Sequence, residues 1–332
     1  MEKFKPNQNF DYYLNFIVER MEIFWKRYFH VPLPVTDDPI FRDFKFTNVY
    51  RALDRVSQYL IRDVIYNGKE YSKEDMFFRI LLFKHFNKIE TWKQLESELG
   101  DITLDVDFDN IIEVLDEMIP RGPIYSNAYV VNCCFFQMEK YSHIQGWSKH
   151  RAHIDIFRKE IFENGFVNKL LAAESALELY NLLHSLSIYG DFTAQQYTFD
   201  FMYSPLFDFS ENDFIVAGPG AKKGIEWTFD FETGVRCRID YTAVIKWVHE
   251  HLEELLDGWQ KQHPGKEFIP LPGRMPTLID LQNCFCETSK YSKGLGNRFS
   301  KKKEKIKNVF SPNKNEIDFM FPPKWNITMP EK

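Results

Sequence analysis

The stretch 45-KFTNVYRALDRVSQYLIRDV-64 decides the fold, because its apolar residues recur at the helical period. The recurring residues, at steps of four, three and four, are Val49, Leu53, Val56 and Leu60. Such spacing places them on one face of a helix, where they can pack against a core. We therefore predict one continuous amphipathic helix over residues 45–64.

The opposite side of this predicted helix carries hydrogen-bond donors, namely Asn48, Arg51, Arg55, Gln58 and Arg62. Arginine and amide side chains offer several N–H groups per helical turn, which suits the binding of DNA phosphates. The alternative is an ordinary solvated face that is partly neutralised by Asp54. The phosphate-binding interpretation makes Asn48, Arg51 and Arg55 candidate DNA-binding residues.

The composition of the 332-residue chain, 44% apolar and 17% aromatic, predicts a well-packed interior. Most segments with periodic apolar residues indicate helices, and only residues 129–137 and 229–241 favour strands, the second as a short hairpin. We predict a mainly α fold with a single unit over residues 1–310, and the alternative is two lobes of about 1–145 and 146–310. Residues 311–332 form a C-terminal extension.

No segment has the apolar run of a membrane span or of a signal peptide, so the sequence predicts a soluble, cytoplasmic protein. The five cysteines include no C-x-x-C pair, which favours reduced thiols over a zinc site. His150 and His153 have the spacing of metal ligands, but no further ligand is suitably spaced. We expect neither a metal nor another cofactor.

The net charge of −6 argues against a basic coat, but the charge is uneven. Between residues 290 and 307 eight lysines or arginines stand against one glutamate. This segment is either a phosphate-binding arm or a solvated linker.

A possible helix–hairpin–helix lies in 182-LLHSLSIYGDFTAQQYTFDF-201. In such a hairpin the N–H groups at the start of the second helix point at a DNA phosphate. Of the usual L-P-G-x-G pattern only Leu186 and Gly190 are present, so an ordinary turn between helices is the alternative.

A second candidate anion site is 214-FIVAGPGAKKGI-225. Gly218 and Gly220 flank Pro219, and Lys222 and Lys223 follow, which suits a nest of backbone N–H groups around an anion. The segment lacks the G-x-x-x-x-G-K-[ST] pattern of a nucleotide-binding loop. A structural turn is the alternative.

A third candidate is 277-TLIDLQNCFCETSKY-291. Asp280, Glu287 and Lys290 share one helical face with Asn283, and carboxylates beside a lysine can perform acid–base chemistry. The alternatives are a capping box from Thr277 to Asp280 and a surface pair of Glu287 with Lys290.

Five segments together resemble a known helical family: 16-FIVERMEIFWKR-27, 34-PVTDDPIFRDFKFTNVYRALDRVSQYLIRDV-64, 190-GDFTAQQYTFDFMYS-204, 211-ENDFIVAGPGAKKGI-225 and 278-LIDLQNCFCETSKY-291. The family is the 5-hydroxymethyl-deoxyuridine DNA kinase helical domain, also called α-glutamyl/putrescinyl thymine pyrophosphorylase. The resemblance implies a fold like that of helix-hairpin-helix DNA glycosylases. It also implies action on hypermodified pyrimidines in phage-type DNA and a link to anti-phage defence.

The resemblance carries over position by position. The family's recurring residues fall on Asn48, Arg51, Asp54, Arg55, Gly190, Phe192, Ala194, Gln196, Asp200, Gly218, Pro219, Gly220, Ala221, Cys286, Glu287, Lys290 and Tyr291. This chain departs from the family at Gln195, where a tyrosine is usual. It departs again at Thr288 and Ser289, where an aromatic residue and an acid are common. These departures concern the substrate more than the fold.

The implied fold also suggests catalytic acids. A glycosylase of this type has a carboxylate some twenty residues after its hairpin, which stabilises the cationic sugar as the base leaves. That count makes Asp213 a candidate, with Asp200 and Asp240 as alternatives, and Glu287 joins them from the third segment. Gln196, Asn48 and the tyrosines near residues 125–129 would line a pocket for the base.

Our leading prediction is a DNA glycosylase that flips a modified pyrimidine and cleaves its glycosidic bond. One alternative is a base-modifying transferase or pyrophosphorylase that exchanges a group at the 5-methylene of thymine. Another is a non-catalytic DNA-binding module. The partner in each case is DNA that carries modified pyrimidines, and the oligomeric state stays open. The candidate DNA-contacting residues are Asn48, Arg51, Arg55, Gly190, Gln196, Gly218, Gly220, Lys222, Lys290 and Tyr291.

Overall fold

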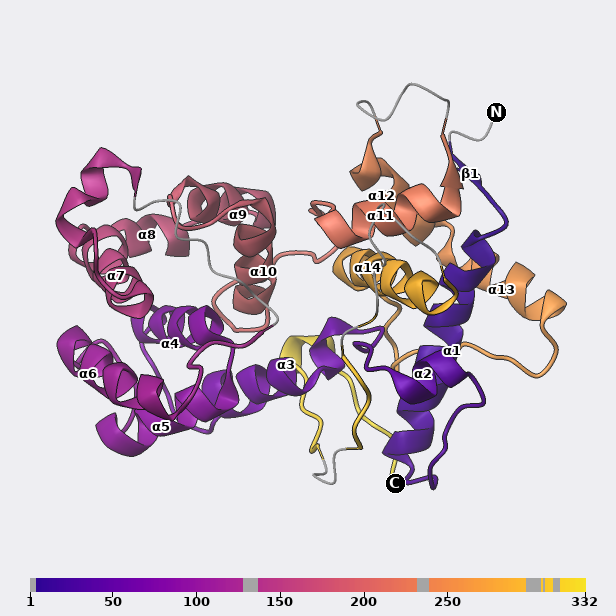
Figure 1. The fold of residues 1–332 in the computed structure, drawn as a ribbon, viewed down its shortest axis with the longest axis horizontal. Coiled ribbons are helices and arrows are strands. Elements are labelled where there is room, and N and C mark those ends of the chain that lie inside the picture. The colour runs from indigo at the N-terminus through magenta and orange to yellow at the C-terminus, as the bar shows by residue number, and fades with distance from the viewer. Residues whose placement is uncertain (1–3, 128–136, 232–238, 297–305, 307, 313–316) are drawn as a thin grey trace. The chain divides into compact units, whose positions relative to one another are not determined.

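The computed structural model describes residues 4–127, 137–231, 239–296, 306, 308–312 and 317–332 (Figure 1). The chain divides into two compact units. Unit 1 comprises Met1–Asp54 and Ile215–Lys332, and unit 2 comprises Arg55–Phe214. The mainly α prediction is confirmed, since the described residues form helices and one short two-stranded sheet. The predicted single domain of residues 1–310, with lobes meeting near residue 145, stays a prediction.

Unit 1 is built around helix α14 (Leu278–Gly294), against which three other helices pack. Its remaining elements are β1 (Lys5–Pro6), α1 (Phe10–Tyr28), α2 (Pro39–Asp43), a 3-10 helix (Arg51–Leu53), α11 (Pro219–Thr228), β2 (Phe229–Asp230), α12 (Tyr241–Glu250), α13 (Leu252–Gln262) and a 3-10 helix (Pro323–Trp325). The core is aromatic: the rings of Tyr13 and Phe285 stack with centroids 4.0 Å apart. Burial of each such ring stabilises the unit by about 1.5–3 kcal/mol.

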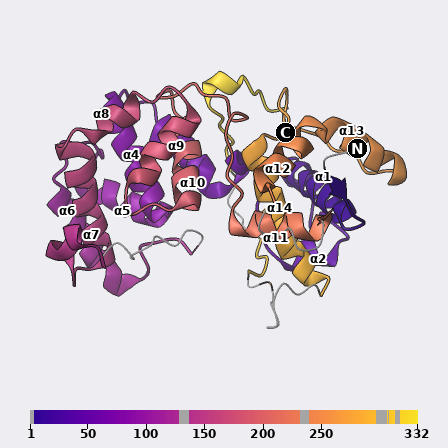
Figure 2. The same ribbon diagram turned by 90° about the horizontal axis from the view of Figure 1, so that it is seen from above.

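The described residues of unit 2 form a bundle of helices whose centre is the largely buried helix α4 (Lys73–Phe86) (Figure 2). Its remaining elements are α3 (Arg55–Tyr59), a π-helix (Leu60–Ile65), α5 (Ile89–Leu99), α6 (Phe108–Met118), a 3-10 helix (Ile119–Arg121), a 3-10 helix (Glu139–Ile144), α7 (Lys149–Ile156), a π-helix (Phe157–Glu163), α8 (Phe166–Leu171), α9 (Ala176–Ser185) and α10 (Asp191–Met202). Helix α10 packs against both α4 and α9.

The predicted continuous helix over residues 45–64 was wrong. The segment contains a 3-10 helix at Arg51–Leu53, an extended residue at Asp54 (ψ 141°), then α3 and a π-helix. Asp54 accepts hydrogen bonds from the main-chain N–H of Asn48 (3.0 Å) and from its side-chain amide (3.1 Å). An aspartate that satisfies nearby N–H groups in this way competes with helix formation. The break at Asp54 is also the boundary between the two units.

The two predicted strand regions lie mostly in residues 128–136 and 232–238, which are outside the described parts of the chain. Of the described residues in the second region, Phe229 and Asp230 form β2 and Tyr241 begins α12. The partner of β2 is the N-terminal strand β1, with Lys5 opposite Asp230 and Pro6 opposite Phe229.

The starts of two helices, α4 and α14, are marked by a capping side chain. Ser72 accepts a hydrogen bond from the N–H of Asp75 and thereby caps α4. Thr277 and Asp280 form the predicted capping box of α14. None of the helices in the described parts of the chain is long and apolar enough to cross a membrane.

Candidate nucleic-acid interface

A pocket of about 320 Å³ lies in unit 1 between the start of α11 and the second half of α14. Its lining residues are Pro219, Gly220, Lys223, Cys286, Glu287, Ser289, Lys290, Lys293, Ile306 and Asn308. The pocket therefore joins two of the segments that the sequence singled out, the Gly-Pro-Gly turn and the Cys-Glu-Thr-Ser-Lys stretch.

The two glycines of α11 allow its close approach to α14. A Cβ atom on Gly220 would lie 2.2 Å from the sulfur of Cys286, and one on Gly224 would lie 2.1 Å from the carbonyl oxygen of Phe285. Any larger residue would push the helices apart. The glycine spacing i, i+4 keeps both positions on the face of α11 that meets α14.

The pocket has a positive balance, because Lys223, Lys290 and Lys293 stand against Glu287. Helix α11 adds the partial positive charge of its N-terminus. Gly218 is its N-cap residue and Pro219 follows in the first turn. The N–H of Gly218 donates to Oε1 of Gln282 on α14 (3.1 Å), which fixes the start of α11 beside α14.

Glu287 and Lys290 hold the segment that follows α2. Glu287 accepts hydrogen bonds from the N–H of Thr47 (3.0 Å) and from Nζ of Lys290 (3.1 Å). Lys290 also donates to the carbonyl oxygen of Lys45, and its ammonium lies 4.6 Å from the centre of the Phe46 ring. The lysine head is thus held in one place at the edge of the pocket.

A buried charge network supports this arrangement. Nε of Arg20 donates to the carbonyl oxygen of Thr47 (3.0 Å), and burial lowers the pKa of Arg20 to about 10. Burial also raises the pKa of Asp54 from 3.8 to about 6, against the opposing effect of its hydrogen bonds from Asn48. Both groups are electrostatically coupled to Glu287. This network links the pocket to the residue at which the predicted helix breaks.

The pocket also contains a cysteine that is unsuited to nucleophilic chemistry. Burial raises the pKa of Cys286 to about 11, so its sulfur is a thiol at neutral pH. Its contact with Gly220 makes it a packing residue of the α11–α14 contact.

The other predicted residues of unit 1 have mostly structural contacts. Arg51 is 4% exposed, and its main-chain N–H donates to Oδ1 of Asp280 (2.8 Å). Asp240 caps α12 by accepting from the N–H of Ala243 (3.0 Å). Tyr291 is buried and donates to Oδ2 of Asp38 (2.6 Å). Lys222 is exposed and lies over the ring of Tyr241, outside the pocket lining.

The remaining predicted residues belong to unit 2 and so are not part of this pocket. Asp200 is 1% exposed and lies 2.7 Å from Nζ of the buried Lys84. Gln196, also on α10, is buried in the unit. Asp213 is exposed in the segment after α10, and Arg55 is exposed and lies 3.8 Å from Glu90.

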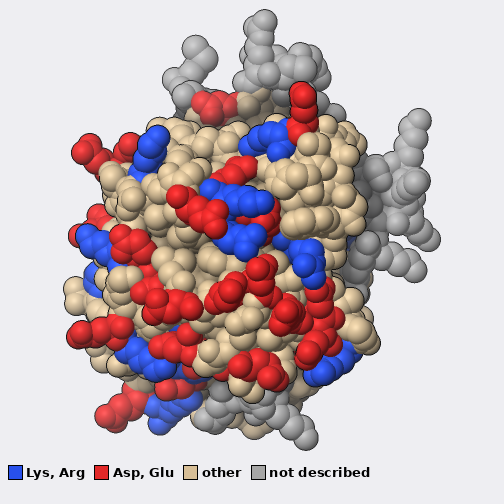
Figure 3. All heavy atoms as spheres, turned by 90° about the vertical axis from the view of Figure 1, so that its left-hand side faces the viewer, with Lys and Arg blue, Asp and Glu red and all other residues tan. Residues whose placement is uncertain are grey.

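The segment of the predicted helix–hairpin–helix contains two helices, α9 and α10, with Gly190 as the N-cap of α10 (Figures 1 and 2). However, the first turn of α10 contains Asp191, whose side chain is 70% exposed and pairs with His184 (2.9 Å). A carboxylate at this position repels the phosphate that such a hairpin would bind. Figure 3 shows a face of unit 2 on which acidic and basic side chains are interspersed.

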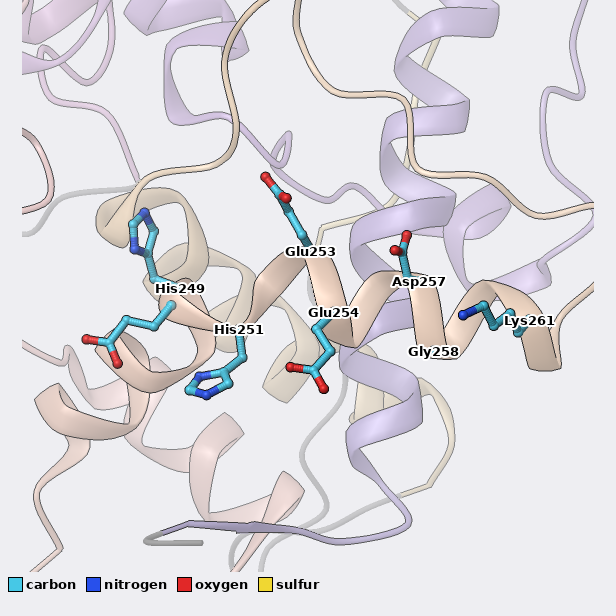
Figure 4. Close-up of a pocket in the computed structure, with 8 residues that line it drawn as sticks. His249, His251, Glu253, Glu254, Asp257, Gly258 and Lys261 are labelled. Atoms are coloured by element: carbon cyan, nitrogen blue, oxygen red, sulfur yellow. The ribbon is translucent and has the colours of Figure 1, made fainter.

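A larger hollow of about 830 Å³ lies along the end of α12 and along α13. Four carboxylates line it, those of Glu250, Glu253, Glu254 and Asp257. Figure 4 shows Glu253 and Asp257 pointing to one side of α13 and Glu254 to the other, so these groups do not converge. Within the described ranges no group of three or more His, Cys, Asp or Glu side chains is placed to hold a metal ion.

Sequence reasoning noted Lys223 beside Lys222 and included Lys293 in the basic segment 290–307, but it made neither a single candidate residue. Lys223 follows Pro219 by four residues and so lies on the same side of α11. Arg20 was missed altogether. The role of Arg20 depends on Thr47, which is distant in sequence, so no local pattern could reveal it. Most of the predicted basic segment 290–307 is not described, because residues 297–305 and 307 lie outside the described parts of the chain.

Comparisons with known proteins agree with the resemblance. The family model for the helical domain of 5-hmdU DNA kinase matches residues 7–301. The 5-hmdU DNA kinase of Bacillus phage SP10 is 26% identical over 295 residues, which is 84% of this chain and 44% of the phage protein. The chain therefore spans less than half the length of that relative. No solved structure matches the chain.

These matches correct the leading prediction, since a DNA kinase transfers a phosphoryl group and does not cleave a glycosidic bond. The prediction of a DNA glycosylase was wrong, and the roles given to Asp213, Asp200, Asp240 and Glu287 in that cleavage fall with it. The predicted alternative, a base-modifying group transferase, is closer to the finding. With a match that extends over nearly all of its length, the chain belongs to the family of 5-hmdU DNA kinase helical domains.

Proposed function

We propose that this chain binds DNA containing 5-hydroxymethyl-deoxyuridine and holds it for phosphoryl transfer to the hydroxymethyl group. Two findings support the substrate: the family to which the chain belongs, and the name of the phage relative. The kinase activity belongs to a relative more than twice as long as the matched region, so it enters here as part of the proposal.

The chemistry of such a transfer sets what the DNA-binding part must do. The hydroxymethyl oxygen forms a bond to the terminal phosphorus of a nucleoside triphosphate and loses its proton, while the bond to the departing nucleoside diphosphate breaks. Catalysis of this kind depends on positioning and on electrostatic stabilisation. A protein region whose rigid helices bind the DNA backbone would fix the position of the acceptor oxygen.

The observation that carries the proposal is the convergence of Lys223 from α11 with Lys290 and Lys293 from α14 on one pocket. Lysines and a helix N-terminus are common partners of DNA phosphates. The acidic residues of unit 1 that line the larger hollow belong to α12 and α13. A DNA strand would therefore be attracted to the α11–α14 pocket and repelled by the hollow.

The test replaces the three pocket lysines together, as Lys223→Gln/Lys290→Gln/Lys293→Gln, with Lys222→Gln on the same helix as the matched control. Affinity for an oligonucleotide with one 5-hydroxymethyl-deoxyuridine is measured by fluorescence anisotropy at several salt concentrations. The triple variant should bind at least about ten-fold more weakly. Its plot of log affinity against log salt should be shallower by about 2–3, because each lost phosphate contact removes about one unit of slope. Equal affinity and slope in the triple variant and the control would refute the proposal.

The substrate part is tested separately with paired oligonucleotides that differ only in the hydroxymethyl group. The unchanged protein should bind the 5-hydroxymethyl-deoxyuridine oligonucleotide more tightly than its thymidine counterpart. Equal affinities would leave a DNA-binding protein that does not distinguish this base, contrary to the proposal.

A further inference from the structure

A row of aromatic rings extends from the core of unit 1 to partly exposed side chains. It begins at the buried Phe46, whose ring centre is 6.1 Å from that of Tyr291, and continues to Tyr12 at 6.3 Å. Tyr12 stacks on Trp227, with centres 5.5 Å apart and planes inclined by 20°. Tyr12 and Trp227 are both partly exposed, whereas Tyr291 and Phe46 are buried.

The row has a pocket lysine close to each of its ends. Trp227 lies one helical turn after the pocket residue Lys223 on α11, so the two side chains are neighbours on the same face. At the other end, the ring centre of Phe46 is 4.6 Å from the ammonium of the pocket residue Lys290. Cationic groups and aromatic rings therefore lie near one another in this part of unit 1.

The stacked pair is held by bonds from the N-terminal segment. The side-chain amides of Asn7 and Asn9 both donate to the carbonyl oxygen of Trp227, at 3.2 and 3.0 Å. Tyr12 lies in the first turn of α1, which begins directly after these asparagines. The rings are thus fixed relative to each other before any ligand binds, which lowers the entropy cost of binding.

We infer that Tyr12 and Trp227 form a stacking platform for unpaired nucleobases, and that the DNA bound at the lysine pocket has a single-stranded segment. This inference rests on the proposed DNA-binding function. Proteins that bind single strands combine cationic groups along the backbone with aromatic rings on which the bases stack. The bases of a duplex are already stacked on one another, so only unpaired bases can use such a platform.

A second stacked pair in the same unit serves as a matched control. Trp247 and His251 stack with ring centres 4.8 Å apart, and both are partly exposed. His251, however, lines the carboxylate-rich hollow. Its surroundings disfavour DNA, although the ring geometry is comparable.

The first experiment compares Trp227→Leu, Trp227→Phe and Trp247→Leu in binding a twelve-nucleotide single strand and a hairpin duplex, each with one 5-hydroxymethyl-deoxyuridine. Trp227→Leu should weaken single-strand binding at least about five-fold, which corresponds to about 1 kcal/mol. The affinity of Trp227→Leu for the duplex should change by less than about two-fold, because the contacts with the DNA backbone stay intact. The affinities of Trp247→Leu for the single strand and for the duplex should also change by less than about two-fold. Trp227→Phe should recover most of the single-strand affinity because it keeps a stackable ring.

If Trp227→Leu does not fold, a second experiment tests the inference with the unchanged protein. A single strand with 5-iodo-deoxyuridine in place of the modified base is cross-linked by light to the unchanged protein, and the linked peptides are identified by mass spectrometry. Links to Tyr12 or Trp227 support the inference, whereas links confined to other residues overturn it. The two proposals fail differently. If the affinity for the single strand falls in the pocket-lysine variant but not in Trp227→Leu, only the stacking platform is overturned. If the affinity does not change in the pocket-lysine variant, the proposed function is refuted.

Discussion

Helices α11 and α10 both begin after a glycine, Gly218 in one case and Gly190 in the other, and each forms a pair with a neighbouring helix. Their surroundings are opposite in charge. The start of α11 is accompanied by Lys223 and by two lysines of α14, whereas the first turn of α10 contains the exposed Asp191. The partial charge of a helix N-terminus is the same in both. The neighbouring side chains therefore decide which helix start can bind a phosphate.

Two acidic residues, one from each unit, differ in their surroundings. Asp200 of α10 is fully enclosed and pairs with a buried lysine, while Glu287 of α14 lies at the edge of a pocket and orients a lysine there. Removal of the first should damage the fold, and removal of the second should mainly affect the pocket.

The largest effect is expected from Lys84→Met, which leaves the carboxylate of Asp200 buried without its lysine. Breaking a buried ion pair on one side typically costs about 3–5 kcal/mol. Urea unfolding should show a loss of this size, and the double variant Lys84→Met/Asp200→Leu should recover a large part of it. Glu287→Gln is the control and should cost less than about 1 kcal/mol. A Lys84→Met protein as stable as the parent would remove the structural role of Asp200.

Gly224→Ala should destabilise unit 1 by about 1–3 kcal/mol, because the added methyl group collides with the carbonyl oxygen of Phe285. Gly258→Ala in the interior of α13 is the matched control, since no atom lies within 4 Å of its added Cβ. That substitution should be neutral or stabilising by up to about 1 kcal/mol through helix propensity. If thermal unfolding showed similar midpoints for both variants, the close contact of α11 with α14 would be in doubt.

Acidification should act on the two units in opposite directions through His85 and Asp54. Burial, with His153, Lys149 and His150 nearby, holds the pKa of His85 well below its ordinary 6.5. Only the unfolded state then gains a proton as the pH falls through about 6.5, so His85 lowers stability in acid.

Asp54 has the reverse effect, because burial, helped by the nearby Glu287 and opposed by Arg20, raises its pKa from 3.8 to about 6 in the fold. The folded state takes up a proton first as the pH falls through about 6, so Asp54 adds stability in acid. Urea unfolding at about pH 7 and about pH 5.5 checks both signs. Relative to the parent, His85→Gln should lose less stability on acidification and Asp54→Asn should gain less. The same pH response in all three proteins would contradict these pKa shifts.

The smallest effect is expected from Arg55→Ala. Its side chain is half exposed and lies 3.8 Å from a more exposed Glu90, and surface pairs of this kind contribute about 0–1 kcal/mol. Chemical denaturation should place the variant within about 0.5 kcal/mol of the parent. A larger loss would mean that Arg55 has a structural role comparable with that of the buried Arg51. The role of Arg55 in DNA binding stays a prediction.

Local signals predicted much of the fold and only part of the site. The capping box of Thr277 and Asp280 marks the start of α14 through side-chain chemistry within a few residues, and the structure confirms it. The break at Asp54 was missed because the apolar period continues across it, while the decisive bonds come from Asn48. The glycosylase prediction came from the fold that the resemblance implies, and the charge of Asp191 at the hairpin was not considered.

The pocket itself required long-range information. Gly220 and Cys286 are 66 positions apart in the sequence, and their contact creates the pocket that the lysines line. Lys222 and Lys223 look equivalent in the sequence, yet only the second lines the pocket. Periodicity could have separated them once the partner face of α11 was known, but no pattern within the segment identifies that partner.

The most direct test of the account is hydrogen–deuterium exchange of the protein with and without a single strand containing 5-hydroxymethyl-deoxyuridine. The account predicts slower exchange in residues 219–228 and 278–294, the segments of α11 and α14, and no change in residues 191–202 of α10. Slower exchange at the start of α10 without any change in α11 and α14 would contradict it.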